Sequence, residues 1–311
     1  MRLSLLRLAL AGAIAGGFLA AAPISAAASA AEVPPGFTSN MANVNGVRLH
    51  FVSGGAGPAL ILIHGFPQDW SEYRAIMPRL SKRFTVMALD LRGIGQSSIA
   101  SGGYDADALA KDVYELAKAQ KLDDVYVVGH DLGGQVAYAF ARQYPSVTRG
   151  AMLLDAPLPG IDGWDDVDHD PSVWHIHFMQ VPGLPEKLLA GRQNVWLDYF
   201  LQFGKFSPAD KADSYAAYDS SGHVGAALAI YRAFPANGRV NAAAKGPSDT
   251  PITIATGDKS PFAHLIPTMA AGVHAVGFSH VDTDTVANSV HYLVEDNPDG
   301  VAALIERHAG K

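Results

Sequence analysis

A short apolar strand that runs directly into a Gly-x-Asp-x-Gly turn constrains this chain more than any other segment. Residues 125–128 are mostly β-branched, the turn Gly-His-Asp-Leu-Gly follows at 129–133, and a helix is expected from near Gln135. The glycines fit a sharp strand-to-helix turn whose tip residue is held in a strained backbone conformation. Such a unit presents the Asp131 carboxylate above the edge of a sheet.

The carboxylate at the tip of this turn indicates covalent chemistry at a saturated carbon. Serine usually occupies the position in hydrolases with such a turn, but aspartate can also serve as a nucleophile. Serine attacking a saturated carbon would form an ether, which water does not easily cleave, whereas aspartate forms an ester that a second step can hydrolyse. The expected electrophile is therefore an epoxide or an alkyl halide. The alternative is that Asp131 only caps the following helix.

The first thirty residues are typical of an export signal. Arg2 and Arg7 form a basic start, residues 8–22 are apolar and rich in alanine, and Ala-Ser-Ala at 28–30 offers a cleavage site. No arginine pair is present, which favours general secretion over the twin-arginine route, and the apolar stretch is short for a membrane span. We therefore predict a signal peptide over 1–30 and an exported mature chain, periplasmic or secreted, without a membrane span.

Charge and composition exclude several classes of partner. The formal net charge is −7 at pH 7, whereas binding to nucleic acid favours a basic patch. The chain has no cysteine, so it has neither disulfides nor thiolate metal sites. Its 12 histidines show no His-Glu-x-x-His or comparable ligand spacing. We expect no nucleic acid, no cofactor and no metal.

Alternating strand and helix signals predict an α/β fold with a mostly parallel, doubly wound sheet covered on both faces. The expected strands are 47–51, 59–63, 84–89, 125–128, 151–154 and 252–255; the expected helices are 105–120, 135–144 and 298–308, the last capped by Asn297 with Pro298 at its first position.

A change of composition marks a second region between two of these strands. From Pro157 to about Gly246 the chain is rich in Trp, Tyr, Phe and His, and the sheet resumes only at Pro251. We interpret 158–246 as a helical cap inserted over the carboxyl edge of the sheet, where open α/β folds bind ligands. Residues 31–157 and 247–311 would then form the core. The alternative is an ordinary aromatic-rich second domain.

Two backbone amides are expected to face the Asp131 carboxylate. His64-Gly65-Phe66-Pro67 follows an apolar strand, and such a turn can direct the Phe66 amide to the space above Asp131. The Leu132 amide, at the start of the helix after the turn, would be the second donor of an oxyanion hole. Whether Pro67 is cis stays open at this point, and the alternative for the segment is a plain strand–loop junction.

Hydrolysis of an aspartyl ester requires a base and a carboxylate that orients it. Two late histidines compete, and we choose His291 over His280 because it stands just before an acidic, Pro-punctuated entry to the final helix. For the orienting acid we choose Asp155, which ends the 151–154 strand. Asp258 stands too soon after its glycine, and Ser260 occupies the position that such an acid often takes. The alternative for Asp155 is a strand-terminal turn residue.

Taken together, segments 64–67, 129–134, 154–159 and 289–298 resemble the epoxide hydrolase branch of the α/β-hydrolases, and most of all the secreted Cif-type epoxide hydrolases. The resemblance covers nearly the whole mature chain. It implies an α/β-hydrolase fold, conversion of an epoxide and water to a vicinal diol through an aspartyl ester, and a homodimer. In that group the acid follows the strand after the elbow, as Asp155 does, but the Cif type generally uses glutamate there.

The same resemblance implies a His–Tyr pair in the cap that assists opening of the epoxide. His175, in Ser-Val-Trp-His at 172–175, matches the histidine, and Tyr231, in Ile-Tyr-Arg-Ala at 230–233, matches the tyrosine. Such a pair is chemically sensible, because the developing alkoxide needs hydrogen-bond donors and a proton opposite the side of attack. The alternatives are a core histidine and a tyrosine on a helix face.

Two other functions compete with epoxide hydrolysis. Fluoroacetate dehalogenases have a similar cap but hold the halide with a His-Trp pair and the carboxylate with arginines after the nucleophile. Here Ile176 follows His175, and Leu132 to Gln135 follow Asp131 without an arginine. Other haloalkane dehalogenases place a halide-binding tryptophan where this chain has Leu132. The second competitor is a non-catalytic binding protein on the same scaffold.

Overall fold

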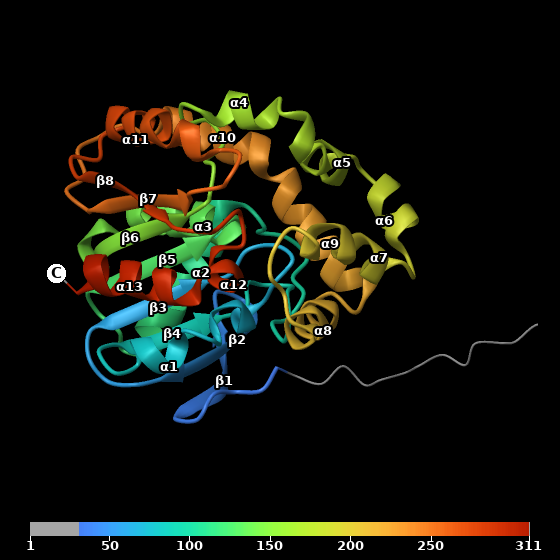
Figure 1. The fold of residues 1–311 in the computed structure, drawn as a ribbon, viewed down its shortest axis with the longest axis horizontal. Helices are drawn as coiled ribbons and strands as arrows, with labels where there is room; N and C mark the ends of the chain where they lie inside the picture. Colours follow the sequence, from blue (N-terminus) through green and yellow to red (C-terminus); the bar gives the residue numbers. More distant parts are fainter. Residues whose placement is uncertain (1–30, 311) are drawn as a thin grey trace, which may run out of the picture.

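A computed structural model describes residues 31–310; the predicted signal peptide, 1–30, lies outside the described residues. Within them, an eight-stranded sheet forms the centre of the molecule (Figure 1), in the order β1-β2-β4-β3-β5-β6-β7-β8. The strands are β1 (Phe37–Val44), β2 (Val47–Gly54), β3 (Ala59–Ile63), β4 (Thr85–Leu89), β5 (Val125–His130), β6 (Thr148–Leu154), β7 (Ile252–Gly257) and β8 (Val281–Val286). From β4 to β8 the neighbours pair in parallel, so the predicted fold class is confirmed.

The two edge strands were not expected from the sequence. β1 pairs antiparallel with β2 through a tight turn in which Asn45 and Gly46 have φ of 45° and 77°. β8 has the sequence Val-Asp-Thr-Asp-Thr-Val and adds in parallel to β7. Edge strands expose much of their surface, so neither shows the apolar run of the buried strands between them.

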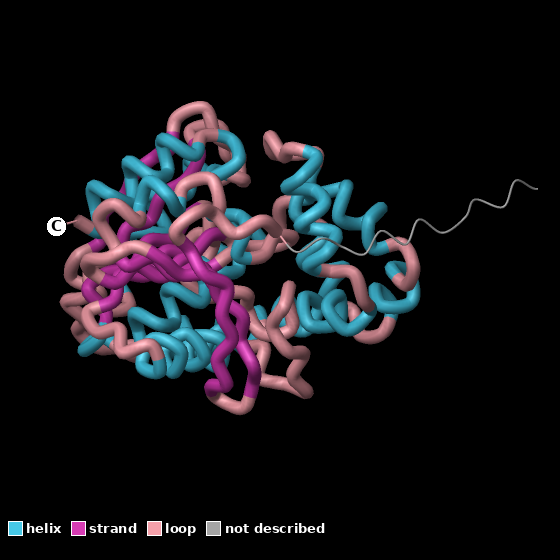
Figure 2. The backbone as a smooth tube through the Cα atoms, turned by 90° about the horizontal axis from the view of Figure 1, so that it is seen from below, coloured by secondary structure: helices cyan, strands magenta, loops and turns pink. Residues whose placement is uncertain are grey.

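Helices cover both faces of the sheet, as Figure 2 shows from below. One face packs against α2 (Ala106–Ala119), α3 (Leu132–Gln143) and α11 (Ile266–Ala275), and the other against α1 (Met77–Leu80), α12 (Leu293–Asp296) and α13 (Pro298–Ala309). The Asn297 side chain accepts a hydrogen bond of 2.9 Å from the Gly300 amide, and Pro298 opens α13, as predicted.

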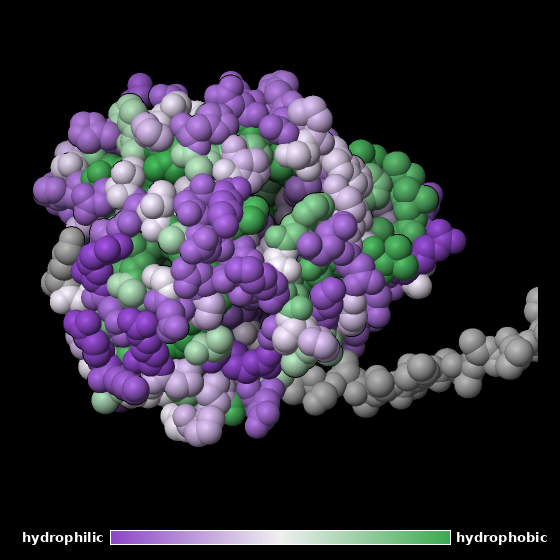
Figure 3. Space-filling model, viewed as in Figure 1, coloured by the Kyte–Doolittle hydropathy of each residue, from purple (hydrophilic) through white to green (hydrophobic). Residues whose placement is uncertain are grey.

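A helical insertion separates β6 from β7 and lies beside the carboxyl edge of the sheet (Figure 1). Its helices are α4 (Trp164–Asp168), α5 (His175–Gln180), α6 (Leu184–Leu189), α7 (Gln193–Leu201), α8 (Pro208–Ala217), α9 (Ser221–Arg232) and α10 (Phe234–Ala243). Several of its apolar side chains are exposed, among them Leu188 in α6 and Val195 in α7. Hydrophobic side chains gather at the right of the space-filling view (Figure 3), on the side where Figure 1 shows α6 and α7. The insertion thus presents apolar surface outward as well as toward the core.

Candidate active site

Asp131 stands at the tip of the turn between β5 and α3. Its backbone has φ of 49° and ψ of −118°, a conformation that side-chain-bearing residues rarely adopt. The flanking glycines are required by close packing. A Cβ on Gly129 would lie 2.0 Å from the Gly133 carbonyl oxygen, and one on Gly133 would lie 2.1 Å from that of Ile63. The Gly-x-Asp-x-Gly sequence is therefore what allows this turn to form.

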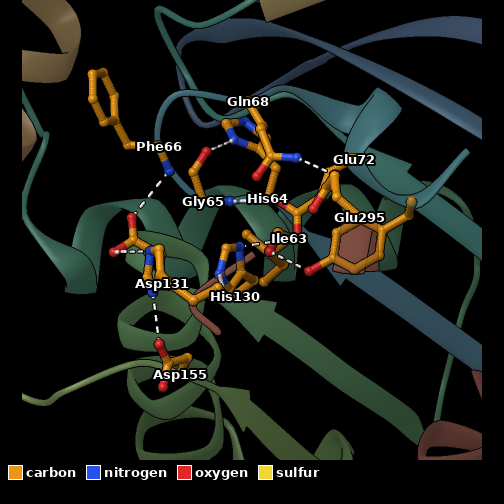
Figure 4. Close-up of polar contacts among 12 residues, drawn as sticks. Ile63, His64, Gly65, Phe66, Gln68, Glu72, His130, Asp131, Asp155 and Glu295 are labelled. Atoms are coloured by element: carbon orange, nitrogen blue, oxygen red, sulfur yellow. Dashed lines mark hydrogen bonds and ion pairs between the residues drawn. The ribbon is translucent and has the colours of Figure 1, made fainter. Parts of the chain in front are cut away.

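The loop after β3 directs a backbone amide at the Asp131 carboxylate. The Phe66 amide donates a hydrogen bond of 3.0 Å to Asp131 Oδ1 (Figure 4), and the Phe66–Pro67 peptide bond is cis. The Leu132 amide begins α3 beside the carboxylate, but within the described chain no hydrogen bond joins the two. One of the two predicted donors therefore already faces the carboxylate, and Leu132 stays a prediction.

His291 lies between Asp131 and Asp155. Its Nδ1 is 2.7 Å from Asp155 Oδ2, and its Nε2 is 3.8 Å from Asp131 Oδ2. A carboxylate accepting from Nδ1–H leaves Nε2 free to accept a proton on the side that faces Asp131. The arrangement has the order nucleophile, base and orienting acid.

Asp155 is held by two hydroxyl groups as well as by His291. It directly follows β6 with a φ of 42°, and its carboxylate accepts from the hydroxyls of Thr256 and Ser260, the latter at 2.9 Å. Ser260 is the residue at the position that an orienting acid often takes. In this chain the Ser260 hydroxyl, after β7, donates a hydrogen bond to the orienting acid Asp155, which follows the neighbouring strand β6.

The alternative candidates for the base and the orienting acid, His280 and Asp258, do not contact the Asp131–His291–Asp155 set. His280 is exposed just before β8, and its carbonyl oxygen accepts from the Ile252 amide at the start of β7, the opposite edge of the sheet. The Asp258 carboxylate accepts from the Ser289 backbone amide at 3.2 Å. Asp258 thus supports the loop that leads to His291 and does not contact the imidazole.

The insertion closes a cavity of about 310 Å³ over Asp131. Asp131 and His291 line it from the core, His175 and Tyr231 line it from the insertion, and aromatic rings such as Phe200 and Phe234 form much of the wall. His175 and Tyr231 come from α5 and α9, and their ring centroids are 6.2 Å apart. The structure therefore brings all five predicted catalytic side chains to one cavity.

The two insertion residues are uncharged at neutral pH. Burial lowers the pKa of His175 to about 4, although the nearby Asp131 carboxylate opposes the shift. The Nδ1 atom of His175 has no partner within residues 31–310. Burial, reinforced by the Asp131 charge, raises the pKa of Tyr231 well above its ordinary value of 10. Tyr231 consequently holds its proton firmly, and both side chains can donate a hydrogen bond into the cavity.

A buried polar network behind Asp131 was not predicted from the sequence. Glu72, in a short 3-10 helix over Trp70–Tyr73, accepts from the Gly65 amide at 2.9 Å and lies 3.1 Å from His130 Nδ1. His130 Nε2 is 2.9 Å from the His291 carbonyl oxygen, and Glu295 accepts from the Gln68 amide (Figure 4).

The charges of this network follow from burial and proximity. Burial alone would lower the pKa of His130, but the carboxylates of Glu72, Asp131 and Glu295 outweigh it and raise that pKa to about 10. Burial and the charge of Glu72 raise the pKa of Glu295 well above its ordinary value. At neutral pH His130 is thus a cation, and it lies 3.1 Å from the Glu72 carboxylate.

Residues 31–310 contain neither a candidate metal site nor a membrane-spanning helix. No group of three or more His, Asp and Glu side chains there is arranged to hold a metal ion. In the same range, no helix combines the length and the apolar character needed to cross a membrane.

Comparison with known families agrees with the geometry. Residues 58–298 match the family described as alpha/beta hydrolase fold, so the chain belongs to the α/β-hydrolases. This confirms the predicted α/β-hydrolase family.

The curated relatives include proteins named for two different activities, epoxide hydrolysis and fluoroacetate dehalogenation. The soluble epoxide hydrolase of Corynebacterium sp. (strain C12) is 43% identical over 124 residues, which are 40% of this chain and 43% of that protein. The fluoroacetate dehalogenase of Burkholderia sp. is 35% identical over 162 residues, 50% of this chain and 53% of that protein. The chain thus spans about half the length of the curated relatives it matches.

The solved structures are similar over a longer range. Cfl2 from Burkholderia cenocepacia is 34% identical with a TM-score of 0.82, covering 89% of this chain and 98% of that one. The epoxide hydrolase CorEH is 29% identical with a TM-score of 0.80, and the match covers 88% of this chain and 99% of that one. A variant of aCif shares the fold: it is 24% identical with a TM-score of 0.78, and the match covers 89% of this chain and 90% of that one.

Proposed function

We propose that this chain is an epoxide hydrolase that forms a covalent ester on Asp131 and releases a vicinal diol. The observation that carries the proposal is the placement of two neutral donors, Tyr231 and His175, across the cavity from a carboxylate backed by the His291–Asp155 pair. An epoxide oxygen stays on the product and leaves as an alkoxide, so it gains from a proton donor, whereas a halide leaves as a weakly basic anion.

The first half of the reaction is an opening of the ring. An Asp131 oxygen bonds to one epoxide carbon, the bond from that carbon to the ring oxygen breaks, and the oxygen takes the Tyr231 proton while His175 donates a hydrogen bond. The product of this step is an aspartyl ester of a β-hydroxy alcohol, with Tyr231 transiently a phenolate.

The second half hydrolyses that ester. His291 takes a proton from water, whose oxygen adds to the ester carbonyl, and the Phe66 amide stabilises the oxyanion together with the predicted Leu132 donor. Collapse breaks the acyl–oxygen bond, and the departing oxygen takes the proton from His291. Asp131 emerges as an acid and returns its proton to Tyr231, so each turnover consumes one water.

The experiment that tests this proposal traps the ester. His291→Gln should slow hydrolysis of the ester far more than its formation, so mass spectrometry after exposure to styrene oxide should show an adduct on Asp131. The matched control is His280→Gln, which alters an exposed histidine at the other sheet edge and should leave turnover unchanged. Full turnover by His291→Gln, or an adduct on another residue, contradicts the mechanism.

A dehalogenase with the same nucleophile is the second candidate, because a fluoroacetate dehalogenase is among the relatives. Halide release from fluoroacetate, chloroacetate and 1-bromobutane is measured beside diol formation. Halide release without any diol would replace the proposed reaction and leave Asp131 as nucleophile. If neither halide nor diol is formed, the result favours a non-catalytic binding protein. Export remains a proposal that rests on the sequence of residues 1–30.

A further inference from the structure

A second set of side chains with the order serine, histidine and aspartate lies at the edge of the sheet. Ser39 Oγ on β1 is 2.8 Å from His50 Nε2 on β2, and His50 Nδ1 is 2.8 Å from Oδ2 of Asp90, which directly follows β4. Three strands separate β1 from β5, the strand that leads to Asp131 (Figure 1). This set is therefore distinct from the cavity over Asp131, which none of its members lines.

The contacts of Asp90 determine where the protons of this set lie. Its carboxylate is fully buried and also accepts from the backbone amides of Trp70 and Gln96, each at 2.9 Å. A carboxylate held in this way accepts from Nδ1–H of His50, which directs the Nε2 lone pair toward Ser39. The Ser39 hydroxyl therefore donates to Nε2, and its oxygen keeps lone pairs for attack.

The histidine of this set is held rigidly, whereas the serine is accessible. His50 is 1% exposed, its ring packs edge-on against Trp70, and its backbone amide donates to Ser97 Oγ at 2.9 Å. Ser39 is an exposed residue on an edge strand. A fixed imidazole beside a reachable hydroxyl is the arrangement that activates serine toward acyl groups.

We propose that Ser39 is a second nucleophile of this protein, activated by His50 and Asp90, and that it accepts acyl groups from small aryl esters. An exposed position on a strand offers little area to bind a substrate, so the site favours acyl donors with a good leaving group. Ser39 acts independently of Asp131 in this scheme, and its chemistry is acyl transfer in place of attack at a saturated carbon.

The proposed reaction has two steps. Ser39 Oγ bonds to the ester carbonyl carbon, its proton passes to His50 Nε2, and the bond to the aryl oxygen breaks; the departing aryl oxide takes that proton. In the second step His50 takes a proton from water, whose oxygen adds to the acyl carbon, and Ser39 Oγ leaves with the proton. One ester and one water thus give one carboxylic acid and one phenol.

4-Nitrophenyl acetate tests the site in Asp131→Ala protein, in which the epoxide nucleophile cannot contribute. Peptide mass spectrometry should place an acetyl group on Ser39, and adding Ser39→Ala should slow release of 4-nitrophenolate about tenfold or more. His50→Gln should slow it to the same extent. The matched control is Ser53→Ala, which removes a hydroxyl of β2 that accepts from the Asn40 side-chain amide at 3.4 Å and should leave the rate unchanged.

The absence of cysteine from the sequence permits a second measurement that does not depend on acyl chemistry. Ser39→Cys and Thr38→Cys each introduce the only thiol of the protein, at neighbouring exposed positions of β1. His50 should draw the proton only from a thiol at position 39, so iodoacetamide should alkylate Ser39→Cys about tenfold faster than Thr38→Cys. Adding His50→Gln to Ser39→Cys should remove that advantage.

Each comparison has an outcome that overturns the proposal. Acetyl groups on lysines alone, with unchanged release of 4-nitrophenolate after Ser39→Ala, remove Ser39 as a nucleophile. Equal alkylation of Ser39→Cys and Thr38→Cys removes its activation by His50. Thermal unfolding reports whether His50→Gln folds, and if it does not, these two comparisons decide. Ser39→Ala should form diol from styrene oxide as wild type does, so a failure of epoxide hydrolysis leaves the result at Ser39 standing.

Discussion

Replacing Asp155 by asparagine should abolish most turnover, and the contacts of the carboxylate indicate why. Asp155 accepts from His291 Nδ1 at 2.7 Å and from the hydroxyls of Ser260 and Thr256. An amide keeps the size of the side chain but replaces one acceptor by an NH₂ donor. If that group faces Nδ1, the imidazole must present its lone pair there and carry its proton on Nε2, where it cannot act as a base.

The expected size of the effect follows from the tautomer. The corresponding change in serine hydrolases lowers kcat about 10⁴-fold, and here we expect about 10³- to 10⁴-fold, or about 4 to 5.5 kcal/mol in the barrier. The loss should fall on ester hydrolysis, because formation of the ester does not need a base. Rapid mixing with styrene oxide should therefore show a normal first rate and an accumulated Asp131 ester.

Asp258→Asn is the matched control for this variant. Its carboxylate accepts from the Ser289 amide at 3.2 Å and does not contact the imidazole, so turnover should fall less than about fivefold. A larger loss in Asp258→Asn than in Asp155→Asn, or a slowed first step in Asp155→Asn, would refute the assignment of the orienting acid.

Three further outcomes are expected. Tyr231→Phe removes only a hydroxyl and should slow formation of the Asp131 ester about 100-fold or more, as followed by mass spectrometry, with unchanged thermal unfolding; an unaltered rate would remove Tyr231 from ring opening. Ser260→Ala should lower turnover only about fivefold to tenfold, because Asp155 keeps its other partners, and a loss as large as that of Asp155→Asn would contradict this view. His175 has a folded pKa of about 4 against 6.5 when exposed, so its contribution to stability is complete above pH 6.5 and declines as pH falls toward 4. Urea unfolding at pH 7 and pH 5 should show wild type losing up to about 2 kcal/mol more than His175→Gln, and equal losses would show that His175 is not buried in its neutral form.

The sequence could predict the parts of the site that are written in contiguous motifs. The turn at 129–133 and the loop at 64–67 each place a backbone group by local geometry, so their residues identify them without knowledge of the packing. The edge strand β1 was missed, although Asn45-Gly46 is a strong hairpin signal. β8 carries no such signal, because its polar, exposed side chains lack a period that marks a buried face.

Contacts between distant segments could not be predicted in the same way. Gln68 and Glu295 lie 227 residues apart in the chain and meet only because η1 (Trp70–Tyr73) and α12 pack together. The bond from Ser260 to Asp155 likewise depends on the pairing of β6 with β7.

The buried Glu72–His130 pair has a consequence for how this scaffold can diversify. Through the Gly65 amide and the His291 carbonyl, the pair fixes the Phe66 loop and the His291 loop in one frame. Displacing either loop would leave one member of this buried pair without a hydrogen-bond partner, at a cost of about 1 to 3 kcal/mol. The insertion meets this frame through aromatic packing, as where Tyr231 contacts Phe66. Recombination that exchanges the segment between β6 and β7 would thus replace the wall of the cavity together with His175 and Tyr231, while Asp131, His291 and Asp155 are inherited unchanged.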